Sequence, residues 1–220
     1  MKNNASQEPS DPNKIDPSVR AEWERFLDPQ VLRPSLILTS VYIAAFEILK
    51  NAVVEDLRDF FITGWDQESG WIIAPEYKDE VLSKDKSATY ASLKWLKEAN
   101  AIDNDDIGKF GTAKKYRNLL AHEITKMLAQ GIPPDFAERF NDMVALLDKI
   151  GRWWILNVEI PTDPDLASQA GEIDEDGIIP GRIMNLRMMI DVALGSDEVA
   201  NYYITEFRKS MGSQAGPPSE

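Results

Sequence analysis

The residues best suited to chemistry lie in one short segment, from Arg117 to His122. It reads Arg-Asn-Leu-Leu-Ala-His and holds the only histidine of the 220-residue chain. Imidazole can accept and donate a proton near neutral pH, and the planar, permanently charged guanidinium of arginine fits phosphate oxygens. Asn118 adds a side chain that can donate and accept hydrogen bonds. The segment therefore predicts chemistry on a phosphate group, with Arg117, Asn118 and His122 as candidate catalytic residues.

Basic residues surround this segment in an acidic protein. The chain has a net charge of −13, yet the stretch from Lys109 to Lys126 has five basic residues and one acidic residue. Positive charge of this kind attracts nucleic acid, so Lys114, Lys115 and Lys126 are candidate binding residues. The alternative is an ordinary solvated helix face. The overall negative charge argues against general nucleic-acid binding.

The segment is expected to lie on one long helix, from about Asp103 to Gln130. At about 100° per residue, Asn118 and His122 fall opposite the apolar stripe of that helix. The predicted buried stripe consists of Ala113, Tyr116, Leu120, Ile124 and Met127. His122 is therefore expected on the polar face, either as a catalytic group or as an exposed bystander.

Helical periodicity dominates the rest of the chain. It predicts helices over 17–27, 34–62, 86–100, 103–130, 134–159, 182–194 and 197–211. The stretch 63–84 is expected to be a loop or extended insert with a short strand at 71–73, and 161–181 an acidic loop. The polar ends, 1–16 and 213–220, are expected to be disordered tails. These elements predict a single all-α domain over 17–212, an up-and-down helical bundle with extra terminal helices.

An arginine, an adjacent polar residue and a histidine after a helical spacer form a pattern similar to the signature of the HEPN superfamily. These all-α domains occur in many prokaryotic toxins and antiviral RNases. The resemblance implies a HEPN-type bundle acting as a metal-independent endoribonuclease on single-stranded RNA, in a toxin or abortive-infection (antiviral defence) setting. An antitoxin or regulatory protein is an expected partner. HEPN toxins silenced by adenylylation carry a Tyr two residues after the His; this chain has Ile124 there, which puts that control in doubt.

The single histidine has a stoichiometric consequence. Cleavage of RNA through its own 2′-hydroxyl calls for a base and an acid, but each chain has one imidazole. A two-fold homodimer would bring together two copies of His122, Arg117 and Asn118. The resemblance to HEPN RNases implies the same composite site. One His122 would act as base and the other as acid, Arg117 would stabilise the phosphorane-like transition state, and Asn118 would orient His122 or the phosphate. The products would be a 2′,3′-cyclic phosphate and a 5′-hydroxyl.

Other features set the expected surroundings of the site. Glu47 interrupts an apolar helix, where it either orients Arg117 from a neighbouring helix or marks the solvent edge.

The chain has no cysteine and one histidine, so we expect no metal and no cofactor. It lacks an apolar leader, and its best apolar run, from Leu36 to Phe46, is too short to span a bilayer, so we expect a soluble cytoplasmic protein.

Two readings compete with the RNase. One is a non-catalytic HEPN-like dimerisation or interaction module that binds a protein partner or a nucleotide, which the acidic surface favours. The other is an unrelated helical protein in which the hexapeptide arose by chance. Aromatic pairs at 153–154 and 202–203 are expected in the core or at a dimer contact rather than stacked on RNA bases.

Overall fold

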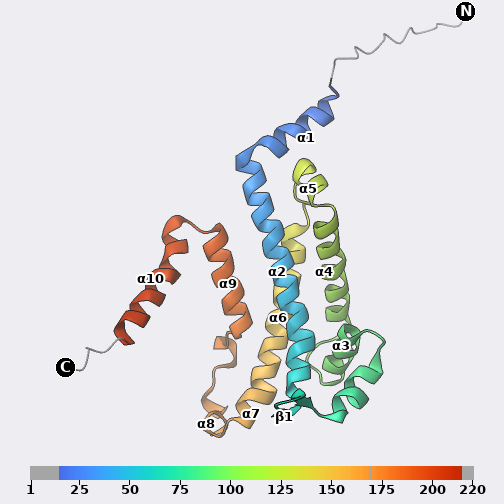
Figure 1. Cartoon of the computed structure of the whole chain (residues 1–220), viewed down its shortest axis with the longest axis vertical. Helices are drawn as coiled ribbons and strands as arrows, with labels where there is room; N and C mark the ends of the chain where they lie inside the picture. The colour runs from blue at the N-terminus through green and yellow to red at the C-terminus, as the bar shows by residue number, and fades with distance from the viewer. Residues whose placement is uncertain (1–14, 169, 215–220) are drawn as a thin grey trace, which may run out of the picture.

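Three long helices form the body of the protein. The computed structural model describes residues 15–168 and 170–214, and α2 (Pro29–Phe60), α4 (Asn104–His122) and α6 (Phe136–Trp154) pack on one another along its long axis (Figure 1). The chain direction alternates from α2 to α4 to α6. A shorter helix, α3 (Ala88–Glu98), packs on α2. The predicted all-α bundle is confirmed.

The remaining elements decorate this body. They are α1 (Pro17–Leu27), β1 (Ile62–Asp66), β2 (Gly70–Ile73), η1 (Tyr77–Val81), η2 (Leu82–Lys84), α5 (Ile124–Gln130), η3 (Ile155–Glu159), α7 (Ile160–Thr162), α8 (Pro164–Ala167), η4 (Ala170–Glu172), η5 (Glu175–Gly177), α9 (Gly181–Leu194) and α10 (Asp197–Gln214). Of the tails expected to be disordered, 1–14 and 215–220 lie outside the described residues. α10 continues to Gln214, so residues 213–214 are helical rather than part of a tail.

The start of α2 differs from the prediction because the helix is capped by Asp28, upstream of the proline at which the sequence predicts it to begin. The helix begins at Pro29, not at Pro34. Asp28 caps it by accepting a hydrogen bond from the Gln30 amide at 2.9 Å, and Pro29 occupies the first turn, where its missing amide hydrogen costs nothing. Pro34 lies inside the helix.

The 63–84 insert is more ordered than predicted. β1 and β2 form an antiparallel hairpin in which Trp65 pairs with Trp71, and η1 and η2 follow it as short helical turns. The predicted strand at 71–73 is present as part of β2. The acidic 161–181 segment likewise contains short helical turns, α8, η4 and η5, each of three or four residues.

The core forms around one face of α2. Its buried side chains recur every three or four residues, as one face of a helix requires: Tyr42, Phe46, Leu49, Val53 and Leu57. By length and composition α2 also resembles a membrane-spanning helix, with a mean hydropathy of 1.6 over 18 residues, of which 44% is buried in the protein. The expectation from the Leu36–Phe46 run missed this, because that run ends at the charged residue Glu47. Core helices of soluble proteins share these properties.

The C-terminal helices extend from the bundle. α9 buries Ile183 and Leu186 against α2 and α6, and Arg182 pairs with Asp56 of α2. α10 packs on α9 and lies on its outer side, away from α4 (Figure 1). In Figure 1, α1 lies at the top of the bundle and α10 lies to its left.

Candidate functional site

α4 positions the Arg117–His122 segment, and its N-terminus is firmly anchored. Asp103 and Asp106 form a reciprocal capping box, in which each side chain accepts from the other's backbone amide at 3.0 Å. Lys149 of α6 donates to the same Asp106 carboxylate at 2.5 Å. The cap and this ion pair hold α4 against α6, so the rotation of α4 about its axis is set.

That rotation buries the face that the sequence predicted. Ala113, Tyr116 and Leu120 are buried, as is Met127 on α5. Ile124 is only half-buried, and the predicted continuous helix over 103–130 is wrong at this point. Glu123 leaves helical geometry with φ −115° and ψ 24°, so α4 ends at His122 and α5 starts in a new direction.

Arg117 reaches across to α2. Its Nη2 lies 2.5 Å from Oε1 of Glu47, and its Nη1 donates to Oδ1 of Asn118 at 3.3 Å. The guanidinium carbon lies 6.0 Å from the ring centroid of Phe46. Nε of Arg117 is buried and has no hydrogen-bond partner among the described residues. Glu47 therefore does contact Arg117, and one donor of the arginine is left without a protein acceptor.

Glu47 is shared between two cations. Besides Arg117, it accepts a hydrogen bond from Nζ of Lys50 at 3.2 Å. Burial alone would raise the pKa of Glu47, but the hydrogen bonds from Lys50 and Arg117 outweigh it and lower the pKa below the usual glutamate value. Glu47 is thus an ionised anchor for both side chains.

A small hollow opens beside this pair. Its volume is about 150 Å³. Its walls come from α2, α3 and α4: Phe46, Glu47, Lys50, Thr89, Phe110, Lys114, Arg117 and Asn118. Nζ of Lys114 lies 5.2 Å from the centroid of the Tyr90 ring, which keeps its charge near the hollow. Three cations around one carboxylate leave a net positive hollow that can accept an anion.

His122 lies apart from the hollow. It is the last residue of α4 and is exposed, and its side chain makes no hydrogen bond with any described residue. Asn118 is one turn before it on the same face, which also carries Lys115 and Leu119 and is exposed throughout. One copy of the chain therefore brings Arg117, Asn118 and Glu47 together, and links them to His122 only through the open face of α4.

The cations near the segment are partly neutralised. Lys109 pairs with Asp105 at 2.9 Å and Lys126 with Glu123 at 3.3 Å. Of the three predicted binding lysines, Lys114 lies at the hollow, Lys115 is on the open face and Lys126 is engaged on α5. The local positive charge that the sequence indicates is therefore weaker in the folded protein.

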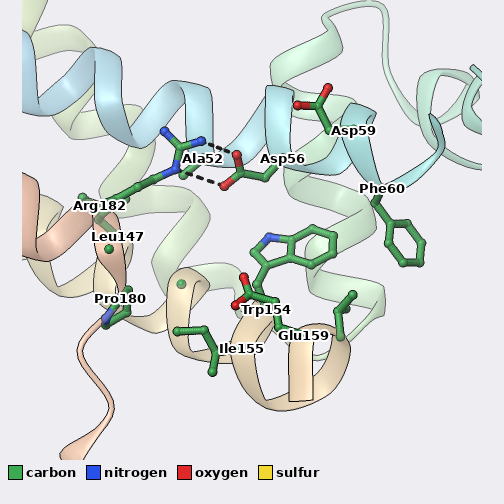
Figure 2. A pocket seen from close by; sticks show the side chains of 13 residues that line it. Ala52, Asp56, Asp59, Phe60, Leu147, Trp154, Ile155, Glu159, Pro180 and Arg182 are labelled. Carbon is green, nitrogen blue, oxygen red and sulfur yellow. Dashed lines mark hydrogen bonds and ion pairs between the residues drawn. The ribbon is translucent and has the colours of Figure 1, made fainter. Parts of the chain in front are cut away.

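A second hollow, of about 380 Å³, lies on the opposite face of α2, between α2, α6, η3 and the start of α9 (Figure 2). Arg182 and Asp56 form one wall of the hollow, Trp154 lies at its centre, and Asp59 and Glu159 also line it. Trp154 is buried and stacks on Trp95 at 6.4 Å, so its expected place in the core is confirmed. Burial raises the pKa of Asp56 despite the hydrogen bond from Arg182. No residue from Arg117 to His122 lines this hollow.

Several residues of the Arg117 hollow escaped the sequence analysis. Lys50, Thr89 and the rings of Phe46 and Phe110 come from three different helices. Only the three-residue spacing of Glu47 and Lys50 hinted at a pair. Within the described residues, no three His, Asp or Glu side chains come together as a metal-binding group.

Comparison with known proteins yields no relative: no family model, no curated protein and no solved structure matches this chain. The resemblance to HEPN proteins therefore rests on the Arg117–His122 pattern of the sequence.

Proposed function

We propose that the protein is a HEPN-like, metal-independent endoribonuclease that cuts single-stranded RNA at a site shared by two copies. The observation that carries the proposal is the setting of Arg117. Glu47 holds its guanidinium beside a positive hollow, next to Asn118, which shares an open helix face with the only histidine. A group that can position a phosphate, Arg117, and a group that can transfer protons, His122, thus lie on adjoining surfaces.

The open face of α4 supports a two-copy site. Lys115, Asn118, Leu119 and His122 are exposed along it, and 38% of Leu119 is accessible. Two such faces related by a two-fold axis would bring both His122 residues to one cleft, flanked by both Arg117 hollows. Helices with small and medium side chains at the contact pack 8–10 Å apart, within reach of these side chains.

The proposed reaction divides proton transfer between the two histidines. Neutral His122 of one copy takes the proton of the 2′-hydroxyl as its oxygen attacks phosphorus. Protonated His122 of the other copy gives a proton to the 5′-oxygen as the phosphorus–oxygen bond to it breaks. Arg117 stabilises the charge that develops on the phosphoryl oxygens. The reaction yields a 2′,3′-cyclic phosphate and a 5′-hydroxyl, and its rate should have a bell-shaped dependence on pH.

A fluorescent single-stranded RNA incubated in EDTA with the wild type, Arg117→Ala or His122→Ala tests the proposal. Each substitution should lower cleavage by at least about a hundredfold, given typical contributions of acid–base groups and charge-stabilising donors. Arg187→Ala is a matched control, because Arg187 is exposed on α9. End-group analysis should find the cyclic phosphate. Cleavage that survives His122→Ala would rule out this mechanism.

The second candidate function is an interaction module of the same fold without catalysis. It is favoured by the net charge of −13 and by the pairing of Arg117, Lys109 and Lys126 with carboxylates of their own chain. On that reading the protein binds a basic partner protein. The wild type would then cut none of a varied set of RNAs, while still forming a homodimer in light scattering.

A further inference from the structure

Lys114 is a cation to which the protein supplies no counter-ion of its own. Its neighbours in the basic stretch, Lys109 and Lys126, pair with carboxylates at 2.9 Å and 3.3 Å. Lys114 forms no ion pair with a described residue, although it is half-buried in the wall of the Arg117 hollow. Its Nζ lies 5.2 Å from the centroid of the Tyr90 ring on α3, which fixes its position. A fixed cation without a counter-ion, in the wall of a hollow, indicates a binding site for an anion.

Other groups of the hollow can bind the same anion. Thr89 lies in the first turn of α3, and its hydroxyl makes no hydrogen bond with a described residue. Arg117 and Lys50 share the single carboxylate of Glu47. Together with Lys114 they give the wall three positive charges against one negative charge. A hydroxyl beside an ammonium group can donate a hydrogen bond that orients an oxyanion. The hollow thus has the charge and the donors to hold an oxyanion in one place.

The size of the hollow restricts the anion to a group about as large as one phosphate. Its volume is about 150 Å³, whereas sites for drug-sized molecules measure about 300–1,000 Å³. A sugar and a base therefore do not fit inside it together with their phosphate. The phosphate must belong to a molecule whose other parts lie outside the hollow, as they do when a single strand of RNA passes over its mouth.

The hollow lies too far from His122 to hold the phosphate that is cleaved. Lys114 and His122 are eight residues apart on α4, which is about 12 Å along the helix axis. Tyr90, which lies under the amine of Lys114, also packs on Phe110, with the two ring centroids 6.4 Å apart. Phe110 is one turn further from His122 than Lys114 is, so the amine points away from the histidine. Lys114 must therefore contact a different phosphate.

We infer that Lys114 and Thr89 bind a phosphate of single-stranded RNA other than the one that is cleaved. Arg117, three residues nearer to His122 along α4, stays available to the cleaved phosphate. The inference rests on the proposed RNase function and adds a requirement on its substrate. A dinucleotide, whose only phosphate is the one cleaved, leaves this subsite empty and should be a poor substrate.

Binding of a fluorescent 2′-O-methyl RNA tests the phosphate contact without cleavage, since this RNA lacks the attacking hydroxyl. Lys114→Met keeps the apolar stem over Tyr90 and removes the charge. Loss of one phosphate contact should make the plot of the logarithm of the association constant against the logarithm of salt concentration shallower by about 0.7. Lys114→Arg keeps the charge and should keep the slope.

Two control variants accompany this measurement. Thr89→Val removes a neutral donor, so it should weaken binding of the 2′-O-methyl RNA and leave the salt slope unchanged. Lys97→Met removes the same charge as Lys114→Met, but at an exposed site on α3 outside the hollow. It should leave both the affinity and the slope unchanged.

Cleavage of modified oligonucleotides locates the second phosphate along the strand. A DNA strand with one ribonucleotide has a single cleavable bond, and a neutral methylphosphonate can replace each flanking phosphate in turn. For the wild type, replacement at one flanking position should lower kcat/KM by about tenfold, as loss of a hydrogen bond to a charged group does. The same replacement should have no effect on Lys114→Met, because that variant has already lost the contact.

The outcomes separate this inference from the proposed function. An unchanged salt slope in Lys114→Met, a wild type that does not bind the 2′-O-methyl RNA, or equal methylphosphonate effects in wild type and Lys114→Met would overturn the inference. A wild type that binds this RNA with the expected dependence on Lys114, but cleaves no RNA, would overturn the RNase and leave the phosphate contact of Lys114 in place.

Discussion

The geometry of Arg117 depends on Glu47. A free arginine side chain has many rotamers, and ordering one costs up to about 2 kcal/mol. Contact with Glu47 on one side and Phe46 on the other makes this ordering part of folding rather than of substrate binding. In this view Glu47 is a positioning residue, because it acts on a bound phosphate only through Arg117.

Glu47→Gln should reveal this pairing as a pH-dependent change in stability. Folding lowers the pKa of Glu47, so its stabilisation is complete above the ordinary glutamate pKa and is lost as the pH falls through the lowered value. Both side chains are about one-third exposed, so we expect a loss of only about 0.5–1 kcal/mol at pH 7. Urea unfolding at pH 7 and at pH 3 measures this difference in the free energy of unfolding. The difference between the variant and the wild type should be smaller at pH 3 than at pH 7, and an equal difference at both pH values would contradict the prediction.

The candidate site could be predicted only as far as residue type and helical spacing reach. Arg117, Asn118 and His122 stand out because one segment holds the only imidazole, and the buried stripe of Ala113, Tyr116 and Leu120 follows from periodicity. The contact of Glu47 with Arg117 joins residues 70 positions apart. It depends on how α2 and α4 are rotated against each other, which no local pattern encodes.

At the scale of elements, helix ends were the least predictable feature. α4 ends at His122 without a glycine or proline, because Glu123 alone departs from helical geometry. As a consequence, His122 lies at a helix terminus rather than inside one continuous helix. The 63–84 insert was equally hard to assign, since its hairpin depends on cross-strand pairing of Trp65 with Trp71.

Two glycines on helices should respond oppositely to alanine. A Cβ on Gly151 of α6 would lie 2.7 Å from Cβ of Pro180, the residue before α9, so Gly151→Ala should destabilise the protein by about 1–3 kcal/mol. Gly108 of α4 has no atom near its added Cβ, so Gly108→Ala should stabilise it by about 0.5–1 kcal/mol. Denaturant unfolding gives both values. Stabilisation by Gly151→Ala would show that α9 does not depend on this close contact with α6.

At the scale of the whole molecule, charge and exposed apolar surface divide the protein into distinct regions. The net negative charge lies outside α9 and α10, where basic and acidic residues balance, and the open face of α4 carries the candidate catalytic groups. α10 exposes the apolar side chains of Ile204, Phe207 and Met211. The all-α class and the long helices could be predicted because their apolar periodicity is strong. The exposure of the apolar side chains of α10 could not be predicted, because it depends on α10 packing mainly on α9 rather than on the three-helix body.

A composite site predicts that an inactive copy interferes with an active one. If both histidines act in one cleavage event, a wild-type chain paired with a His122→Ala chain is catalytically inactive. With free exchange and equal amounts of the two proteins, half of the wild-type chains have an inactive partner. Cleavage per wild-type chain should then fall to about half, and to about a tenth in a ninefold excess of the variant.

The matched control for this mixing experiment is His122→Ala combined with Leu119→Lys. The added lysine places like charges across a paired α4 face, so this protein should not exchange into wild-type pairs and should leave their activity unchanged. Initial rates of RNA cleavage measure both mixtures at fixed wild-type concentration. If the cleavage rate does not change with the amount of His122→Ala protein, one copy is sufficient for RNA cleavage. In that case His122 serves as either the base or the acid, and water serves as the other.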